Sequence, residues 1–293
     1  MDLADARVFG RALGAIARLQ AGLTQEQREW LAAVPVRLAL DAVDLMPERT
    51  GFSQTSPELE AVDAAVSVEC DPDWTGAYWN LVLLHLVVQR LERGWPFALT
   101  AHVHRALLRE LERIAVECET NSPPSDPLGD DDFLLDFGFA VGRLVSFDFA
   151  LLMAPAQLPS GDDDRPWIAV HINGRQPQGA ADWEAWLEEI PPAVEFFRAN
   201  PQFGGMFGVG WISDPQVGEI SPHLAFVRQM MLEGGATIEP VGSTHAETIE
   251  HATSTSNARR QSYEAGAWTP SHYFLRWPME NFLPWASAFE APA

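Results

Sequence analysis

Apolar residues recur at helical spacing through most of the first half of the chain, with polar residues on the opposite faces. Helices are expected over residues 3–19, 36–45, 77–93, 98–119 and 132–153. Thr24 and Gln27 have the spacing of a capping box and precede REWLAA, which predicts a further helix start there. The first half of the chain is therefore expected to be all-helical.

After residue 166 short β-rich runs alternate with helical segments. Strands are expected over residues 167–172, 206–213, 236–241 and 271–277, with helices over 181–199, from Ser221, around Arg259 and over 279–288. This alternation predicts helices packed on a sheet. The intervening APAQLPSGDDDRP is rich in Pro, Gly and Asp, which suits an interdomain linker. The fold class is thus α+β or α/β, with a helical domain at 1–155 and a mixed α/β domain at 166–293.

Composition limits where the protein acts and what it contacts. No uncharged apolar run of the 293 residues reaches membrane-spanning length, so no membrane association is expected. The N-terminus mixes acids with arginines, unlike a signal peptide, which favours a cytoplasmic location. The two cysteines, Cys70 and Cys118, make no disulfide framework and lack metal-ligand spacing.

The net charge is −22, and all 19 cationic side chains are arginine. No basic run is available to bind a phosphate backbone, so no nucleic-acid partner is expected. The absence of lysine excludes Schiff-base chemistry on a lysine and a P-loop lysine. The acidic surface could instead bind a basic protein partner.

Two adjacent arginines, Arg259 and Arg260, follow a run of hydroxyl residues in ATSTSNARRQ. Ser256 or Asn257 is the expected N-cap of a helix there. The arginines would then lie in its first turn, where the helix dipole disfavours cations. One interpretation is a binding site for phosphate or carboxylate, built from guanidinium groups, hydroxyls and backbone N–H groups. In the other, the arginines pair with nearby carboxylates, namely Glu247, Glu250 or Glu264.

DPQVGEISPH places Asp214, Glu219 and His223 just beyond an expected strand, where α/β sheets tend to carry their sites. A carboxylate or imidazole there could deprotonate an amine nucleophile. The alternative is that Asp214 starts a turn, Glu219 is solvated and His223 lies in a first helical turn. A metal site is not expected, because the histidines of THAETIEH lack the spacing of a helical zinc pair.

Three segments carry a resemblance to a known family: VHINGR with His171, VEFFRANP with its double phenylalanine, and GWISDPQVGEISPHL with Trp211 and Asp214. In them the chain resembles bacterial acyltransferase-domain proteins, in which a helical N-terminal domain precedes a domain like that of GCN5-related N-acetyltransferases (GNAT-like). The resemblance implies acyl transfer from acyl-CoA or another acyl thioester. It also implies a tyrosine as general acid toward the leaving thiolate. Tyr263 or Tyr273 could serve, although core packing with a bonded hydroxyl is the alternative for both.

Acetyltransferases of that fold hold the CoA pyrophosphate with a Gln/Arg-x-x-Gly-x-Gly/Ala loop that opens a helix. This chain is expected to lack such a loop. FGGMFGVGW, residues 203–211, has four glycines but leads into Trp211 rather than into a helix. Its glycines are expected to allow a bulge or a close backbone approach within a strand.

Two functions remain open. The first is an acyltransferase that moves an acyl group onto an amine of a small molecule in a pocket between the two domains. Glu219, His223 and Tyr263 are its candidate catalytic residues. The candidates for binding substrate or anion are Ser256, Arg259, Arg260, His171, Trp211 and Asp214. The second function is a non-catalytic binding or partner-interaction protein that retains a GNAT-like fold without a CoA loop.

Overall fold

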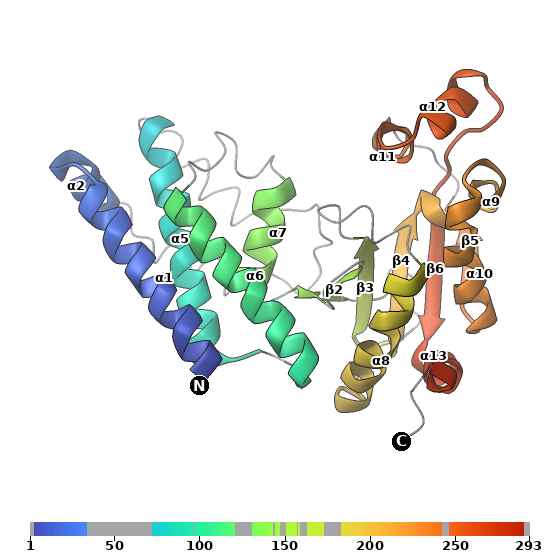
Figure 1. Ribbon diagram of the computed structural model, residues 1–293, viewed down its shortest axis with the longest axis horizontal. Coiled ribbons are helices and arrows are strands. Elements are labelled where there is room, and N and C mark those ends of the chain that lie inside the picture. Colours follow the sequence, from blue (N-terminus) through green and yellow to red (C-terminus); the bar gives the residue numbers. More distant parts are fainter. Residues whose placement is uncertain are drawn as a thin grey trace. The chain divides into compact units, whose positions relative to one another are not determined.

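The computed structural model describes residues 3–33, 72–95, 97–120, 131–142, 144–146, 151–156, 158, 163–172, 183–241 and 246–289. The expected helix over 36–45, Cys70 and His245 lie outside these ranges. Contacts group the chain into two compact units, Met1–Ser146 and Phe147–Ala293. Each unit is described by itself (Figure 1).

The first unit is built from helices. They are α1 (Leu3–Gly22), α2 (Gln25–Ala33), α5 (Pro72–Arg93), α6 (Ala101–Thr120) and α7 (Asp131–Ala140). The helices α1, α5 and α6 pack against one another and bury their apolar faces. The expected capping box forms: Thr24 N–H donates to Gln27 Oε1 at 2.7 Å, and Gln27 N–H donates to Thr24 Oγ1 at 3.2 Å. Among the described residues, the helices predicted over 3–19, 77–93 and 98–119 are confirmed, whereas the two strands β1 (Val145–Ser146) and β2 (Leu151–Ala156) show that the region up to 155 is not all-helical.

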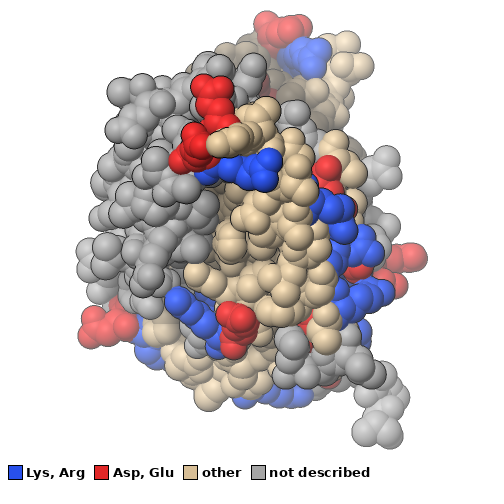
Figure 2. Space-filling model, turned by 90° about the vertical axis from the view of Figure 1, so that its left-hand side faces the viewer, with Lys and Arg blue, Asp and Glu red and all other residues tan. Residues whose placement is uncertain are grey.

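Opposite charges are interspersed on the face of the molecule shown in Figure 2, without one large patch of either sign among the described residues. Ion pairs also link α1 to α6. Arg7 and Arg11 pair with Glu112, and Arg18 pairs with Glu119. The arginine side chains of these pairs are exposed, so each pair contributes little to stability.

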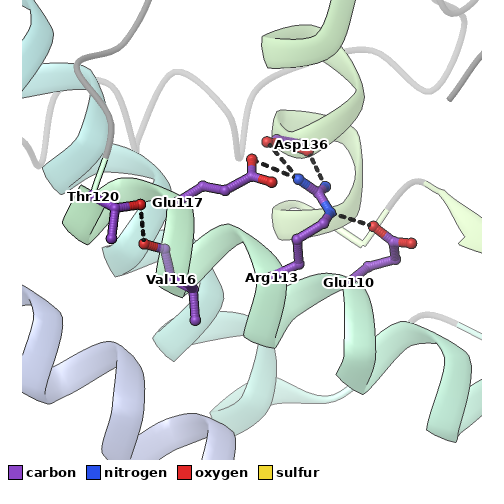
Figure 3. A network of polar contacts seen from close by, with 6 residues as sticks. All are labelled: Glu110, Arg113, Val116, Glu117, Thr120 and Asp136. Atoms are coloured by element: carbon purple, nitrogen blue, oxygen red, sulfur yellow. Dashed lines mark hydrogen bonds and ion pairs between the residues drawn. The ribbon is translucent and has the colours of Figure 1, made fainter.

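Arg113 is the centre of a less exposed network that joins α6 to α7 (Figure 3). Its guanidinium donates to Glu110 at 3.0 Å and to Glu117 at 2.7 Å, both on α6, and to the buried Asp136 on α7. Burial disfavours the charge of Arg113, but the hydrogen bonds and charges of its carboxylate partners outweigh this effect and raise its pKa.

The expected helix over 132–153 is wrong beyond Ala140. Gly142 has φ of 73°, and its N–H donates to Phe139 O at 3.0 Å, as a glycine that ends a helix does. Strands follow at β1 (Val145–Ser146) and β2 (Leu151–Ala156). A short apolar run reads equally well as a buried strand or as a helix, so periodicity alone could not separate them. The expected linker therefore begins inside β2, and the domain boundaries at 155 and 166 stay a prediction.

The second unit contains a mixed sheet with the strand order β2-β3-β4-β6-β5. Its other strands are β3 (Trp167–Ile172), β4 (Gly205–Gly210), β5 (Thr237–Pro240) and β6 (Tyr273–Pro278). Only β3 and β4 are parallel, and they are joined through α8 (Trp183–Ala199). The pairs β2–β3, β4–β6 and β5–β6 are antiparallel. The four expected strands and the mixed helix-and-strand class are confirmed, although β4 is shorter than predicted.

Short helices complete this unit. They are η3 (Trp211–Ser213), α9 (Val217–Ile220), η4 (Pro222–Leu224), α10 (Ala225–Glu233), α11 (Ala246–Ser254), α12 (Asn257–Glu264), α13 (Met279–Ala286) and η5 (Ser287–Phe289). The helices α8 and α13 pack together, and α13 also contacts β4 and β6. Phe196 and Phe197, the double aromatic of α8, are buried in this core, where Phe197 meets Phe282 edge to face. In Figure 1, α11 and α12 lie beyond the end of the sheet toward which β3 points.

The glycines at the start of β4 allow a close backbone approach, as predicted. Gly205 has φ of 154°, and a Cβ added there would lie 2.3 Å from the carbonyl oxygen of Trp277. Any larger residue would push β4 away from β6. Gly210, at the other end of β4, is extended, and a Cβ there would meet no heavy atom within 4 Å.

We expect Arg113→Met to lower the free energy of unfolding by about 3 kcal/mol, because it leaves Asp136 buried without its guanidinium partner. Arg18→Met, which breaks an exposed pair on α1, should cost less than about 1 kcal/mol. Urea unfolding of both variants measures the difference. Equal losses would contradict the central role of Arg113 in joining α6 to α7.

Gly205→Ala should lower the free energy of unfolding by about 2 kcal/mol or more, because it adds a clash to an unfavourable φ. The matched change Gly210→Ala, on the same strand, should alter stability by less than about 1 kcal/mol. Thermal unfolding followed by circular dichroism separates the two. A Gly205→Ala protein as stable as wild type would contradict the close approach of β4 to β6.

Candidate active site

The two parallel strands of the sheet separate toward their carboxyl ends. β3 pairs with β4 only through Ile168↔Met206 and Ala169↔Phe207. Beyond that point β3 stays paired with β2 as far as Ile172, and β4 stays paired with β6 as far as Gly210. Each strand thus keeps its outer partner but loses its inner one. The backbone N–H and C=O groups on the facing edges need partners from outside the ladder.

Two glycines lie on β4 beyond its last pair with β3. A Cβ on Gly208 would lie 3.1 Å from the Val170 carbonyl oxygen, so β4 is still close to β3 just past that pair. At Gly210, the last residue of β4, a Cβ would meet no heavy atom within 4 Å. Open space around β4 is therefore found at its carboxyl end.

The start of α8 lies at the same end of the sheet. Because β3 and β4 are parallel, the helix between them must run back against their direction, which puts its first residue, Trp183, at the carboxyl end of the strands. The first turn of a helix has free N–H groups and a positive dipole end, a combination that binds anions.

The segment before α8 contains a motif that the sequence analysis missed. Residues 176–181 read QPQGAA and fit Gln/Arg-x-x-Gly-x-Gly/Ala, with Gln176, Gly179 and Ala181 at the three specified positions. They lie outside the described residues, so the match is one of sequence. Residues 176–181 contain a single glycine, whereas the glycine-rich stretch of this part of the chain is 203–211. The motif's place between a strand and a helix start was the signal that could have found it.

Two of the predicted site residues stand at the ends of the separating strands. His171 is the next-to-last residue of β3 and pairs with Leu152; its side chain lies outside the described residues. Trp211 begins η3 directly after β4. The structure thus places one predicted residue at the end of each of the two strands.

Arg259 is buried, with 5% of its surface exposed, and its guanidinium is held from three directions. It donates to Ala252 O at 2.5 Å, to Ser221 Oγ at 3.2 Å and to Thr255 Oγ1 at 2.8 Å. Its central carbon also lies 4.8 Å from the ring centroid of Trp211, a cation–π distance. Burial lowers the pKa of Arg259, but an arginine remains charged at neutral pH.

Arg260 is exposed, and its Nη2 donates to Thr253 O at 3.5 Å and to Ser254 O at 3.2 Å. Both arginines therefore bind carbonyls at the C-terminal end of α11, where a cation is favourable, although they sit in the first turn of α12. Ser256 is the N-cap of α12, as predicted, and accepts from Arg259 N–H at 3.3 Å.

The expected pairing of the arginines with nearby carboxylates such as Glu250 and Glu264 is not observed within the described part of the chain. Their guanidinium groups contact carbonyls, hydroxyls and an indole instead. The role of Arg259 and Arg260 in binding an anion stays a prediction.

Asp214 is also buried, at 3% exposure. It accepts from Trp268 Nε1 at 3.2 Å and from the Gln216 N–H at 2.9 Å. Val217 N–H donates to Asp214 O at 3.0 Å, which forms the turn expected at this position. Asp214 thus ties the segment after β4 to the segment after α12.

The remaining candidate residues differ in their exposure to solvent. Glu219 on α9 and His223 on η4 are exposed, and Tyr263 on α12 is half-buried. Trp211, Asp214, Ser256 and Arg259 lie around a small apolar cluster formed by Val217, Leu224, Ala252 and Trp268. The catalytic roles of Glu219, His223 and Tyr263 stay predictions.

Sequence reasoning did not single out the start of β6 as polar. Thr248, which is buried, forms a hydrogen bond of 2.8 Å between its hydroxyl and His272 Nε2. The next residue, Tyr273, pairs with Gly210 in the ladder. Burial and then the charge of Asp214 raise the pKa of Tyr273, while Arg228 opposes this effect. The pairing of SHYF with the end of β4 depends on the tertiary structure, so no local sequence pattern could predict it.

Within the described ranges, no group of three His, Cys, Asp or Glu side chains is arranged to hold a metal ion. None of the helices in the described ranges combines the length and the apolar composition needed to cross a membrane.

No protein-family model matches the chain, and no curated protein matches it. Solved structures do match. One is an acyltransferase in complex with CoA and 10C-teicoplanin, with 18% identity, a TM-score of 0.41, and coverage of 91% of this chain and 99% of that one. Another is an acyltransferase variant in complex with octanoyl-CoA, with 17% identity, a TM-score of 0.42 and the same coverages. A third is an acyltransferase with decanoyl-CoA and teicoplanin, at 18% identity and a TM-score of 0.41. Scores below 0.5 at these identities establish no shared activity.

Proposed function

We propose that the chain is an acyltransferase that moves an acyl group from acyl-CoA, or another acyl thioester, onto an amine of a small molecule. The observation that carries this proposal is the separation of β3 and β4 after two residue pairs, with the start of α8 at the same end of the sheet.

This geometry fits the shape and chemistry of an acyl-CoA. The donor has a narrow arm that contains amide groups, and unpaired strand edges offer amide-binding N–H and C=O groups. The phosphates at its other end fit the first turn of α8 and the Gln176–Ala181 motif that precedes it. The alternative of a non-catalytic binding protein depended on the lack of such a loop, and the QPQGAA match removes that reason.

Acyl transfer to an amine needs a proton acceptor and a proton donor. The amine nitrogen attacks the thioester carbonyl, the carbon–sulfur bond breaks, and the nitrogen loses its proton as the thiolate gains one. Glu219 and His223 are the candidate acceptors. Tyr263 is the candidate donor. Tyr273 is a second candidate because it pairs with Gly210 at the end of β4.

The net charge of −22 bears on the acceptor. A negative field raises the local concentration of cationic amines and lowers that of anions. Amine acceptors are therefore favoured over anionic ones, whereas an anionic donor depends on local groups such as the α8 start. At physiological ionic strength the Debye length of about 8 Å allows such local binding within a distant negative field.

Isothermal titration with octanoyl-CoA tests donor binding. We expect the wild-type protein to bind and Gly179→Val to bind at least 10-fold more weakly, because a branched side chain blocks the close approach of phosphate to the backbone. Ten-fold corresponds to about 1.4 kcal/mol. Gly266→Asn serves as the control, because Gly266 has φ of 67°, which Asn tolerates, and open space around its Cβ position.

Release of free CoA thiol from octanoyl-CoA, with spermidine, tyramine or glucosamine as acceptor, tests the reaction itself. Amine-dependent release by the wild type is the expected result. Failure of the wild type to bind octanoyl-CoA would overturn the proposal. Equal binding by Gly179→Val would overturn the assignment of residues 176–181 alone.

A further inference from the structure

The connection between β5 and β6 is longer than their geometry requires. The two strands are antiparallel neighbours whose last ladder pair is Pro240↔Tyr273, and Val241 N–H extends the contact to His272 O at 2.9 Å. Two to five residues suffice to join such strands. Instead the chain forms α11 and α12 before it returns, and long connections of this kind usually carry function. We call α11, α12 and the residues up to 272 the insert.

Buried polar contacts hold the insert to the segment that leaves β4. Arg259 of α12 binds Trp211 and Ser221, and Trp268 beyond α12 binds Asp214. At the base of the insert, Thr248 of α11 binds His272. The insert is therefore fixed beside the carboxyl end of β4 and the start of β6.

Burying Arg259 to make this connection lowers the stability of the fold. Its guanidinium is buried, yet its hydrogen-bond partners among the described residues are a carbonyl and two hydroxyls, without a carboxylate. A charge taken out of water without an opposite charge destabilises the fold relative to a well-packed apolar side chain. What a planar guanidinium adds is direction, because its hydrogen bonds and its stacking on an indole fix one orientation.

We propose that Arg259 is a positioning residue for acyl transfer, which fixes Trp211 at the end of β4 and thereby holds the insert where the acceptor amine binds. The inference rests on the proposed function. The donor is assigned to the β3, β4 and α8 side, so the acceptor approaches from the side of β6, β5 and the insert. Loss of Arg259 then impairs use of the acceptor and leaves donor binding intact.

The test compares Arg259→Gln and Arg259→Lys with the control Gln261→Ala. Gln261 is the matched control because its side chain is exposed on the same helix, α12. Three quantities are measured: the Kd for octanoyl-CoA, the rate of its slow hydrolysis without amine, and kcat and KM for whichever of spermidine, tyramine or glucosamine the wild type uses. Arg259→Gln should raise KM for the amine at least 10-fold, with donor Kd and hydrolysis within two-fold of wild type. The KM of Arg259→Lys should lie between those of wild type and Arg259→Gln, and Gln261→Ala should stay within two-fold of wild type.

Hydrogen–deuterium exchange separates this inference from the proposed function. Arg259→Gln should increase amide exchange in α11 and α12 at least five-fold while α8 is unchanged, whatever the activity. If Arg259→Gln does not fold, Trp211→Phe replaces it, because it keeps an aromatic ring but weakens the stacking, and a three-fold rise in amine KM is expected. Unchanged amine KM, or parallel losses in donor and amine binding, would overturn the positioning role. A wild type that neither binds nor consumes octanoyl-CoA would overturn the proposed function. The exchange result would still decide whether Arg259 holds α11 and α12 in place.

Discussion

The crossover through α8 is the constraint on which the second unit depends. The helix α8 runs back along the sheet between β3 and β4, so these two strands are parallel, whereas every other described pair within this sheet is antiparallel. β3 is thus bound firmly to β2 and β4 firmly to β6, with a short ladder between them. The same crossover places the start of α8 beside the unpaired edges. Strand separation, helix start and the end of β4 come together because of one connection.

The half-buried Arg113 and the buried Arg259 show how differently a guanidinium can be accommodated. Arg113 is surrounded by Glu110, Glu117 and Asp136, which compensate its burial and join α6 to α7. Arg259 has carbonyl, hydroxyl and indole partners instead. Arg113 is understood as an element of stability. Arg259 is better understood as an element of geometry, since its partners fix its plane but do not neutralise its charge.

Periodicity predicted α1, α5, α6 and all four strands after residue 166, and side-chain chemistry limited the N-cap of α12 to Ser256 or Asn257, of which the structure shows Ser256. Periodicity failed where a signal is not local. The run from 132 to 153 carries apolar residues suited to either element, and Gly142 decides between them. The partners of Arg259 and Arg260 are the last carbonyls of a preceding helix, which have no signature in the sequence. The pairing of Tyr273 with Gly210 required the sheet register. The QPQGAA motif is present in the sequence, but it indicates a phosphate-binding loop only because it lies between a strand and a helix.

The short ladder between β3 and β4 also has a mechanical consequence. The β2–β3 pair on one side and the β4–β6–β5 group on the other are each held by longer antiparallel ladders. Only two residue pairs form the seam between these halves. Opening or twisting the sheet at this seam strains few hydrogen bonds, whereas bending it elsewhere strains many. The seam is therefore the natural hinge of the sheet, and it can open without loss of the pairing that holds each half together.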